Sequence, residues 1–395
     1  MNLRRSVSLG ALAFALCQSS AIAQPAGRVT PPVSLKERLP ELHLLEGPWT
    51  GSTVHGETLL FIAGGKKGPS ARLLYDVEKI LSVRAANRSQ EFQRGRDFEV
   101  SPDGSGLVLP AGSRIRFIGE AELFPAKGAL MSIASRAGHP EASVMFDNAH
   151  YFHDLQVEVT YVPKAPKWEA YRPEFAAETL VRTIGKLKKK QPVTIAVSGD
   201  SISEGYNASE FTKTTPFQPP YPTLVAAQLE ATYGGKVTLH NFAVGGWSSK
   251  NGADDVQRVI KAKPDLAIIA YGMNDVGAKN PNAYRANIET MIRKIHEANA
   301  ETEIILVATM TGNPDWVATP AEMFPVYGDV LASFEGPGIA LADLTSVWQR
   351  FMVRKRHVDM TGNGVNHPDD FGHRVYAQTI LGLLVDPALM PAARP

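Results

Sequence analysis

The second half of the chain alternates short apolar runs with amphipathic stretches, and this alternation constrains the fold more than any other feature. The apolar runs are predicted as buried strands and lie at residues 193–198, 237–244, 266–270, 303–309 and 339–344. The stretches with helical spacing lie at residues 222–233, 254–262, 281–298 and 372–384. Strands that alternate with helices predict a parallel sheet covered on both faces, with functional sites at the carboxyl ends of its strands.

Residues from about 48 to 163 follow a different pattern, in which short strand-like runs are separated by Gly, Pro, Asn and Asp. Examples of these runs lie at 58–62, 71–75 and 155–162, and some of the runs alternate apolar and polar residues as strands with one buried face do. Residues 102–106, Pro-Asp-Gly-Ser-Gly, form a turn signal between two runs. About seven strands with no intervening helix predict a β-sandwich or jelly roll.

These two patterns predict two domains, as a length of 395 residues allows. The smaller all-β domain is expected at residues 28–163 and the α/β domain at residues 176–390. Residues 164–175, between these two domains, are expected to form a linker, because this stretch is rich in proline and shows neither the helical nor the strand period.

The N-terminus has the pattern of a signal peptide at residues 1–23. Two arginines precede a mostly apolar run at 7–17, and Ala-Ile-Ala at 21–23 is a small-residue cleavage site. The apolar run is too short to span a membrane, and no later stretch is long and apolar enough to do so. We therefore expect an exported protein, periplasmic or secreted.

Cys17 is the only cysteine of the chain, and the bulky Leu16 before it disfavours the alternative of a lipoprotein anchor. Cleavage after Ala23 would leave no cysteine, which excludes disulfides and thiolate chemistry. The formal net charge of +1 gives no global electrostatic case for nucleic acid or an anionic membrane surface.

Four short clusters carry residues suited to acyl chemistry. Ser201 ends the sequence Gly-Asp-Ser at the end of a buried strand, where the amides of a following helix turn would stabilise negative charge. Gly246 and Asn274 follow the next two strands; a glycine lets a backbone N–H approach a bound oxygen, and an asparagine amide is a good oxyanion donor. His367 precedes the last helix and has the near-neutral pKa of the usual partner of a serine nucleophile.

Each cluster alone is better explained by ordinary loop structure, because Gly, Asn, Asp and Ser are common in turns and a loop histidine is commonly solvated. The nearby His373 is expected to be a structural residue at the start of the closing helix. The four clusters in this order, each at a strand end or just before the final helix, are much harder to obtain by chance.

At these positions the chain resembles the SGNH (GDSL) hydrolases, over about residues 176–390. The family's four blocks correspond to Gly-Asp-Ser ending at Ser201, to Gly246, to Gly-Met-Asn-Asp around Asn274, and to His367-Pro. The resemblance implies a flavodoxin-like, three-layer parallel-sheet fold, with Ser201 as nucleophile and His367 as its base. It also implies an oxyanion hole formed by the Ser201 N–H, the Gly246 N–H and the Asn274 side chain.

The chain departs from the family at one position. The family usually has an aspartate three residues before the histidine, and this chain has Gly364 there, flanked by the uncharged Asn363 and Asn366. Either an acid from elsewhere completes a triad, with Asp359 as the nearest upstream candidate, or a carbonyl or neutral side chain orients His367 in a Ser–His dyad. We favour the dyad, because Asp359 lies outside the usual spacing.

The sequence thus predicts a serine esterase that hydrolyses short-chain acyl esters, with O-acetyl esters of a carbohydrate as the preferred class. The added β-rich domain resembles the arrangement in certain acetylesterases acting on plant polysaccharides. Trp247 and Trp316 are candidates for stacking on sugar rings, and Asn207 and the loop at 217–221 are candidates for lining the site. The expected partner is a small-molecule or polysaccharide ester.

Three alternatives remain at this point. A lipase or lysophospholipase would show an apolar lid or acyl groove, and no apolar amphipathic segment beyond the needs of the core is apparent. A non-catalytic glycan-binding protein on the same fold would lack one of the four motif residues, and all four are present. A metal enzyme is disfavoured by the scattered histidines, so no cofactor and no metal are expected.

Overall fold

The computed structural model describes residues 34–50, 53–64 and 67–391, and the signal peptide predicted at residues 1–23 lies outside this part of the chain. Ser34–Pro395 form one compact unit. The boundaries proposed inside this unit, at 163 and 176, stay predictions. No helix of the described residues is long and apolar enough to cross a membrane.

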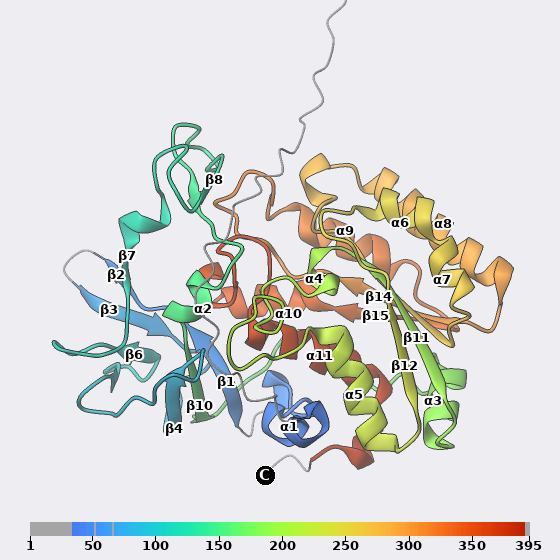
Figure 1. The fold of residues 1–395 in the computed structure, drawn as a ribbon, viewed down its shortest axis with the longest axis horizontal. Helices are drawn as coiled ribbons and strands as arrows, with labels where there is room; N and C mark the ends of the chain where they lie inside the picture. Colours follow the sequence, from blue (N-terminus) through green and yellow to red (C-terminus); the bar gives the residue numbers. More distant parts are fainter. Residues whose placement is uncertain (1–33, 51–52, 65–66, 392–395) are drawn as a thin grey trace, which may run out of the picture. The chain divides into compact units, whose positions relative to one another are not determined.

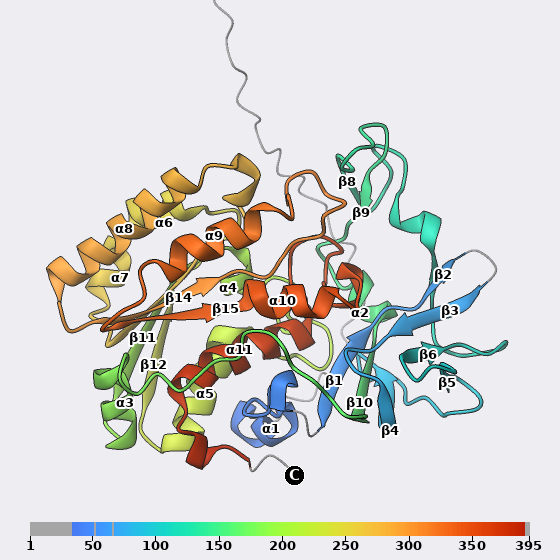
Figure 2. The ribbon, with the colours of Figure 1, turned by 180° about the vertical axis from the view of Figure 1, so that it is seen from behind.

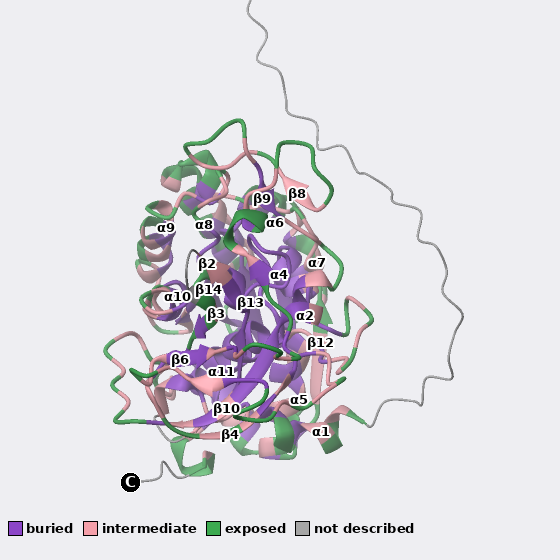
Figure 3. Ribbon diagram, turned by 90° about the vertical axis from the view of Figure 1, so that its left-hand side faces the viewer, coloured by how far each residue is buried: buried purple, intermediate pink, exposed green. Residues whose placement is uncertain are grey.

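A five-stranded parallel sheet forms the centre of the C-terminal region (Figure 1). Its strands run in the order β12-β11-β13-β14-β15, with bounds β11 Val193–Gly199, β12 Val237–Asn241, β13 Leu266–Ala270, β14 Glu303–Ala308 and β15 Ile339–Asp343. The inner strands β13 and β14 are buried at every position, whereas the edge strand β12 is partly exposed (Figure 3). The predicted α/β fold is confirmed, and the order reverses direction between β11 and β13, where such sheets place their ligands.

Helices cover both faces of this sheet (Figures 1 and 2). On one face α5 packs against α11 and α3; their bounds are α3 Val181–Lys188, α5 Tyr221–Tyr233 and α11 Asp370–Leu384. On the other face α8 packs against α6, α7 and α9; the bounds are α6 Ser249–Asp255, α7 Gln257–Lys261, α8 Pro281–Ala298 and α9 Met323–Ala332. Finally, α10, Leu344–Met352, follows β15 directly.

Helix α8 has the bounds predicted from the sequence, because both its N-cap and its buried stripe are encoded locally. The Asn280 side chain accepts a hydrogen bond from the Ala283 N–H at 3.1 Å, and Pro281 occupies the first helical position. The stripe of buried residues that follows, Tyr284, Ile288, Met291, Ile292 and Ile295, has the spacing of one helix face. Cap and stripe therefore define the same helix.

Three helices of the C-terminal region were not predicted, namely α3, α9 and α10. The helix predicted at 254–262 contains α7 but only the last two residues of α6. In α9 the residues Pro325 and Gly328, both unfavourable inside helices, weaken the signal. The strand predicted at 237–244 ends at Asn241, because the chain turns there towards the candidate site.

The N-terminal region is rich in β-strands, and most of its strand pairs are antiparallel (Figure 1). One sheet has the order β1-β10-β4, a second β5-β6-β3-β2-β7, and β8 pairs with β9. The bounds are β1 Val54–Leu59, β2 Ile62–Gly64, β3 Lys67–Arg72, β4 Val77–Ala85, β5 Glu99–Val100, β6 Gly106–Val108, β7 Ile118–Gly119, β8 Ser132–Ile133, β9 Val144–Met145 and β10 Val157–Pro163.

The expectation of strands without an intervening helix was wrong, because α2, Tyr151–Leu155, lies between β9 and β10. Five residues are too few to show a helical period. A further helix, α1, Leu35–Leu42, precedes β1 and packs against α5.

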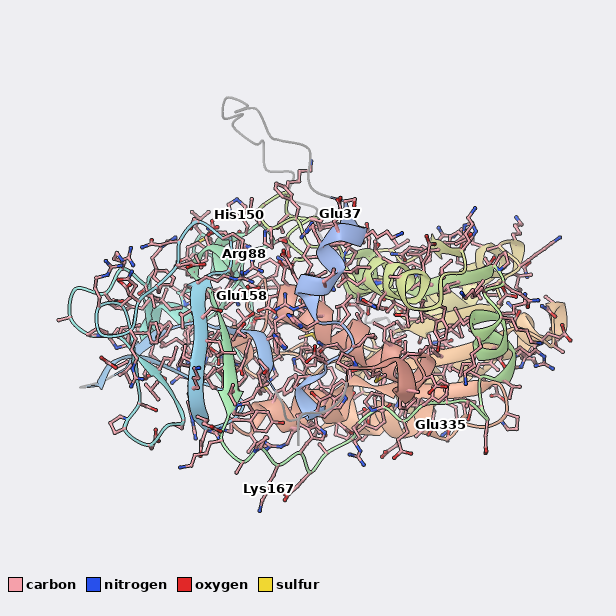
Figure 4. The ribbon with its side chains drawn as sticks, turned by 90° about the horizontal axis from the view of Figure 1, so that it is seen from below. Glu37, Arg88, His150, Glu158, Lys167 and Glu335 are labelled. Carbon is pink, nitrogen blue, oxygen red and sulfur yellow. The ribbon has the colours of Figure 1, made fainter. Side chains whose placement is uncertain are left out.

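Buried ion pairs join the β-rich region to the C-terminal region. The Lys355 ammonium lies 2.6 Å from the Glu57 carboxylate, and neither side chain is exposed. Glu158 of β10 pairs with Arg374 of α11 at 3.5 Å, and within the β-rich region it also pairs with Arg88 (Figure 4). Removal of one partner from such a pair would leave a buried charge, which typically costs about 3–5 kcal/mol of stability.

Candidate active site

The candidate nucleophile, Ser201, is the first residue of the short helix α4, Ser201–Glu204, which directly follows β11. The Asp200 side chain caps this helix by accepting a hydrogen bond from the Ile202 N–H at 3.0 Å. Gly199 makes the turn possible, since a Cβ there would lie 2.9 Å from the Ala270 carbonyl of β13. Ser201 therefore lies at the carboxyl end of the sheet, at its topological switch point.

The candidate base, His367, lies in the loop before α11, and its Nε2 is 2.9 Å from Ser201 Oγ. The two side chains are almost buried, with exposed fractions of 4% for the serine and 6% for the histidine. The Tyr206 ring lies edge-on to the imidazole, with 5.1 Å between the ring centroids. The structure thus joins two residues that are 166 positions apart in a serine–histidine hydrogen bond.

Burial and, to a lesser extent, the nearby His373 together lower the pKa of His367 to about 3. Burial penalises the imidazolium, and among the described residues no carboxylate hydrogen-bonds to the ring to offset that penalty. His367 is therefore neutral at ordinary pH and has its Nε2 side on the serine hydroxyl.

The other ring nitrogen, Nδ1, contacts two side-chain amides. The Asn207 Oδ1 lies at 2.9 Å and the Asn363 Nδ2 at 3.0 Å. Neither amide carries a charge, so the position that holds a carboxylate in a Ser–His–acid triad is neutral here. Asn207 was expected only to line the site, and no sequence signal revealed its contact with the imidazole.

The Asp359 carboxylate has other partners. Its Oδ1 accepts a hydrogen bond from the Leu60 N–H at 3.0 Å, and its Oδ2 accepts one from the Arg356 N–H at 2.8 Å. Burial raises its pKa. In this structure Asp359 ties the loop before His367 to the β-rich region and does not contact the imidazole among the hydrogen bonds of the described residues.

Gly364, at the family's usual aspartate position, cannot accommodate a side chain. Its φ is +87°, and a Cβ there would lie 2.5 Å from the Met145 carbonyl and 2.6 Å from the Phe152 ring. Both neighbours belong to the β-rich region. The packing of that region thus explains the absence of aspartate at this position.

Gly246 and Asn274, the two further oxyanion candidates, lie in loops that meet at the start of α4. The Val244 N–H donates to the Gly199 carbonyl at 3.1 Å, which brings the loop after β12 beside the end of β11. The Asn274 Nδ2 donates to the Trp247 carbonyl at 2.9 Å, which ties the loop after β13 to the same place.

Two backbone donors are free in this arrangement. Within the described residues, neither the Ser201 N–H nor the Gly246 N–H donates a hydrogen bond. Gly246 has a φ of +80°, and no atom lies within 4 Å of where its Cβ would be. Free N–H groups beside a nucleophile are the elements of an oxyanion hole.

The other candidate residues lie around this centre. The Trp247 ring is partly exposed and has the Arg258 guanidinium 5.2 Å from its centroid. The Trp316 Nε1 donates to the Ala134 carbonyl at 3.0 Å, so this ring contacts the β-rich region just after β8. In the loop at 217–221, the Tyr221 hydroxyl bonds to Ser203 of α4 at 2.7 Å, which supports the nucleophile's helix.

One group of possible metal ligands occurs among the described residues, formed by His43, Glu46 and His55 outside the serine–histidine centre. The two imidazoles stack almost parallel, 3.5 Å apart, and His43 Nδ1 lies 3.2 Å from Glu46 Oε1. The lone pairs of parallel rings do not converge on one point, and the nearby Arg374 disfavours a cation there. The group is explained by a hydrogen bond and ring stacking.

The serine–histidine centre lies within a stretch of the chain that matches a known protein family. Residues 197–375, from β11 into α11, match the sequence profile of the GDSL-like Lipase/Acylhydrolase family. The match includes all four motif residues. No curated protein sequence matches the chain.

Several solved structures are similar to this chain. One is a two-domain esterase (CEX) active on acetylated mannans, with 19% identity, a TM-score of 0.44 and 56% of each chain covered. Another is the lipase Lip_vut3 from a goat rumen metagenome, with 17% identity, a TM-score of 0.40 and coverage of 48% of this chain and 96% of that one. A third is a catalytic mutant of Axe2, an acetylxylan esterase from Geobacillus stearothermophilus, with 20% identity, a TM-score of 0.40 and coverage of 48% and 92%.

Proposed function

We propose that the protein is a serine ester hydrolase in which Ser201 is the nucleophile and His367 is the general base. The observation that carries this proposal is the distance of 2.9 Å between His367 Nε2 and Ser201 Oγ, at the switch point of a parallel sheet. The family match over residues 197–375 supports it.

The reaction proceeds in two halves. His367 Nε2 takes the hydroxyl proton as Ser201 Oγ attacks the ester carbonyl carbon, and the oxyanion is held by the free N–H groups and the Asn274 amide. The imidazolium then gives its proton to the leaving alcohol oxygen. In the second half His367 takes a proton from water, the hydroxide attacks the acyl-enzyme, and the carboxylic acid leaves as the proton returns to Ser201 Oγ.

The substrate class that we propose is a short-chain acyl ester, with an O-acetyl group on a carbohydrate preferred. A nucleophile that is only 4% exposed, with its base His367 against the Tyr206 ring, favours a small acyl group. The partly exposed Trp247, next to the oxyanion glycine, offers a face on which a sugar ring would stack. The leader-like sequence at residues 1–23 supports action outside the cytoplasm, in the periplasm or as a secreted enzyme.

The nucleophile is tested by hydrolysis of 4-nitrophenyl acetate. Ser201→Ala should lower turnover by about 10³-fold or more. Ser203→Ala is the matched control, because this hydroxyl lies in the same helix but bonds to Tyr221; it should retain turnover within about tenfold. Near-wild-type turnover in a folded Ser201→Ala protein would refute the proposal.

The acyl group is tested with 4-nitrophenyl esters of increasing chain length and with acetylated glycans beside glycerophospholipids. We expect acetyl esters to react fastest and acetylated glycans to release acetate. Rates that climb with chain length, or fatty acid released from glycerophospholipids, would instead assign a lipase-type activity to the same serine.

A further inference from the structure

We propose that Asn207 is the positioning residue that replaces the triad acid: its amide oxygen selects the His367 tautomer that carries its proton on Nδ1. The β-rich region holds this amide in place through backbone carbonyls. The inference rests on the proposed function, since a tautomer matters to catalysis only if His367 is the base.

The orientation of the Asn207 amide follows from its partners. Its nitrogen lies 3.1 Å from the Gly362 carbonyl, and 3.2 and 3.4 Å from the carbonyls of Ala149 and Asn148. Carbonyls only accept hydrogen bonds, so the NH₂ group must face them and Oδ1 must face His367. The amide is 3% exposed and tightly packed, since a Cβ on Gly362 would lie 2.5 Å from the Asn207 Cβ.

The orientation of this amide decides the protonation of the imidazole. Asn207 Oδ1 only accepts, so at 2.9 Å it requires a proton on His367 Nδ1. In a neutral imidazole with a proton on Nδ1, the lone pair is on Nε2 and faces the Ser201 hydroxyl. This is the tautomer that a general base needs, and a triad acid would select the same one.

Asn363 favours the opposite tautomer. Its Oδ1 accepts hydrogen bonds from the backbone N–H groups of Val365, Asn366 and His367 at 3.0, 3.0 and 3.1 Å. Its NH₂ group therefore faces His367 Nδ1, at 3.0 Å, and would donate to an unprotonated Nδ1. The imidazole thus lies between one amide that accepts and one that donates. The Asn363 Nδ2 also donates to Asn366 Oδ1 at 2.9 Å, so it keeps a partner when Nδ1 carries the proton, and Asn207 tips the balance towards the active form.

One segment of the β-rich region creates this arrangement. The Met145 carbonyl leaves no room for a side chain at position 364, and the Asp147 N–H donates to the Asn363 carbonyl at 3.3 Å. The same segment then supplies two of the carbonyls that hold Asn207. The segment that excludes an aspartate therefore also anchors its replacement.

The experiment combines kinetics with NMR of ¹⁵N-histidine-labelled protein. In the wild-type protein the His367 ring should carry its proton on Nδ1. In Asn207→Ala the proton should move to Nε2, and kcat should fall by about 10²-fold with little change in KM, because a wrong tautomer impairs the base more than binding.

Asn363→Asp is the second variant. It preserves the Oδ1 that anchors the loop, and Asn366, whose Oδ1 accepts from the Asn363 amide at 2.9 Å, must turn its own amide to donate to the new carboxylate. It replaces the donating amide with an anionic acceptor beside Nδ1. The pKa that governs the acid limb of kcat/KM should therefore rise by about one unit or more, and kcat should not fall. Because it leaves Asn207 intact, this variant tests the geometry even if Asn207→Ala fails to fold.

A wild-type ring protonated on Nε2 would overturn the inference, as would a folded Asn207→Ala with kcat within about threefold of wild type. An unchanged acid limb in folded Asn363→Asp would also contradict it. The NMR measurement needs no turnover, so a wild-type protein that hydrolyses no ester would refute the proposed function while the tautomer is still measured.

Discussion

The parallel-sheet region contributes side chains to the candidate site, whereas the β-rich region contributes backbone carbonyls. Ser201, Asn274 and His367 follow strands β11 and β13 or precede α11. From the β-rich region, the carbonyl of Met145 closes position 364, and those of Asn148 and Ala149 hold Asn207. A catalytic side chain leaves a motif in the sequence, but a carbonyl is the same in every residue. The second contribution is therefore visible only in the structure.

The largest effect after loss of the nucleophile should come from the parallel-sheet side. Asn274→Ala removes an oxyanion donor, which typically lowers kcat by about 10²–10³-fold. Asn299→Ala is the control and should leave kcat unchanged, because Asn299 lies between α8 and the start of β14, at the amino ends of the strands, where its amide bonds to Thr302. Steady-state kinetics with an acetyl ester measures both, and equal values of kcat would exclude Asn274 from the oxyanion hole.

The β-rich side of the comparison is tested by Gly364→Ala. Its Cβ would collide with Met145 and Phe152, so it should destabilise the protein by about 1–3 kcal/mol more than a glycine substitution without such a collision. Gly104→Ala is the control, since Gly104 also has a positive φ but nothing lies within 4 Å of its Cβ position. Urea unfolding measures the free energies, and equal losses would show that the β-rich region does not constrain position 364.

Asp359→Asn distinguishes a structural carboxylate from a triad acid. The side chain accepts two backbone N–H groups and has no contact with the imidazole among the described hydrogen bonds, so turnover should stay within about tenfold of wild type. Thermal unfolding should shift to lower temperature, because an amide nitrogen cannot accept one of these bonds. A loss of turnover near 10⁴-fold in folded protein would restore Asp359 as the acid.

The smallest effect should be a shift of the acid limb of the pH–activity profile to lower pH. His367 acts in its neutral form, which is present above its pKa, and burial lowers that pKa from 6.5 to about 3. Activity should therefore persist as the pH falls below 6.5 and be lost only as the pH approaches the lowered value.

The profile is measured as kcat/KM against pH. Burial raises the pKa of Asp200, beside the nucleophile, to about 7, so Asp200→Asn serves to remove any inflection that this carboxyl causes near neutrality. An acid limb near 6.5 that persists in Asp200→Asn would contradict a buried, uncharged environment for His367.

Elements of the fold were predictable where the sequence carries a local signal, in either region. Strand β13 and helix α8 were predicted with their observed bounds, because a continuous apolar run and a capped amphipathic stripe are local signals. Helices α2 and α9 were missed, since one is too short for a period and the other contains Pro325 and Gly328. An element is therefore predictable from the sequence only where its own residues carry a complete signal, such as an apolar run or a capped amphipathic stripe.

The site divides in the same way. The motif residues Ser201 and His367 could be named from the sequence, and the structure places them in hydrogen-bond contact. The contact of Asn207 with His367, and the reason for glycine at 364, depend on the packing of residues far away in the chain. The sequence left the acid open, because tertiary contacts decide which group reaches Nδ1.

The most direct measurement of the central claim is covalent labelling by a fluorophosphonate, followed by peptide mass spectrometry of the protein. We expect one phosphonyl adduct, on Ser201, in the wild-type protein and much slower labelling in His367→Ala, because the reagent needs a serine activated by its base. An adduct on another residue, or equally fast labelling of Ser201 without His367, would contradict the account.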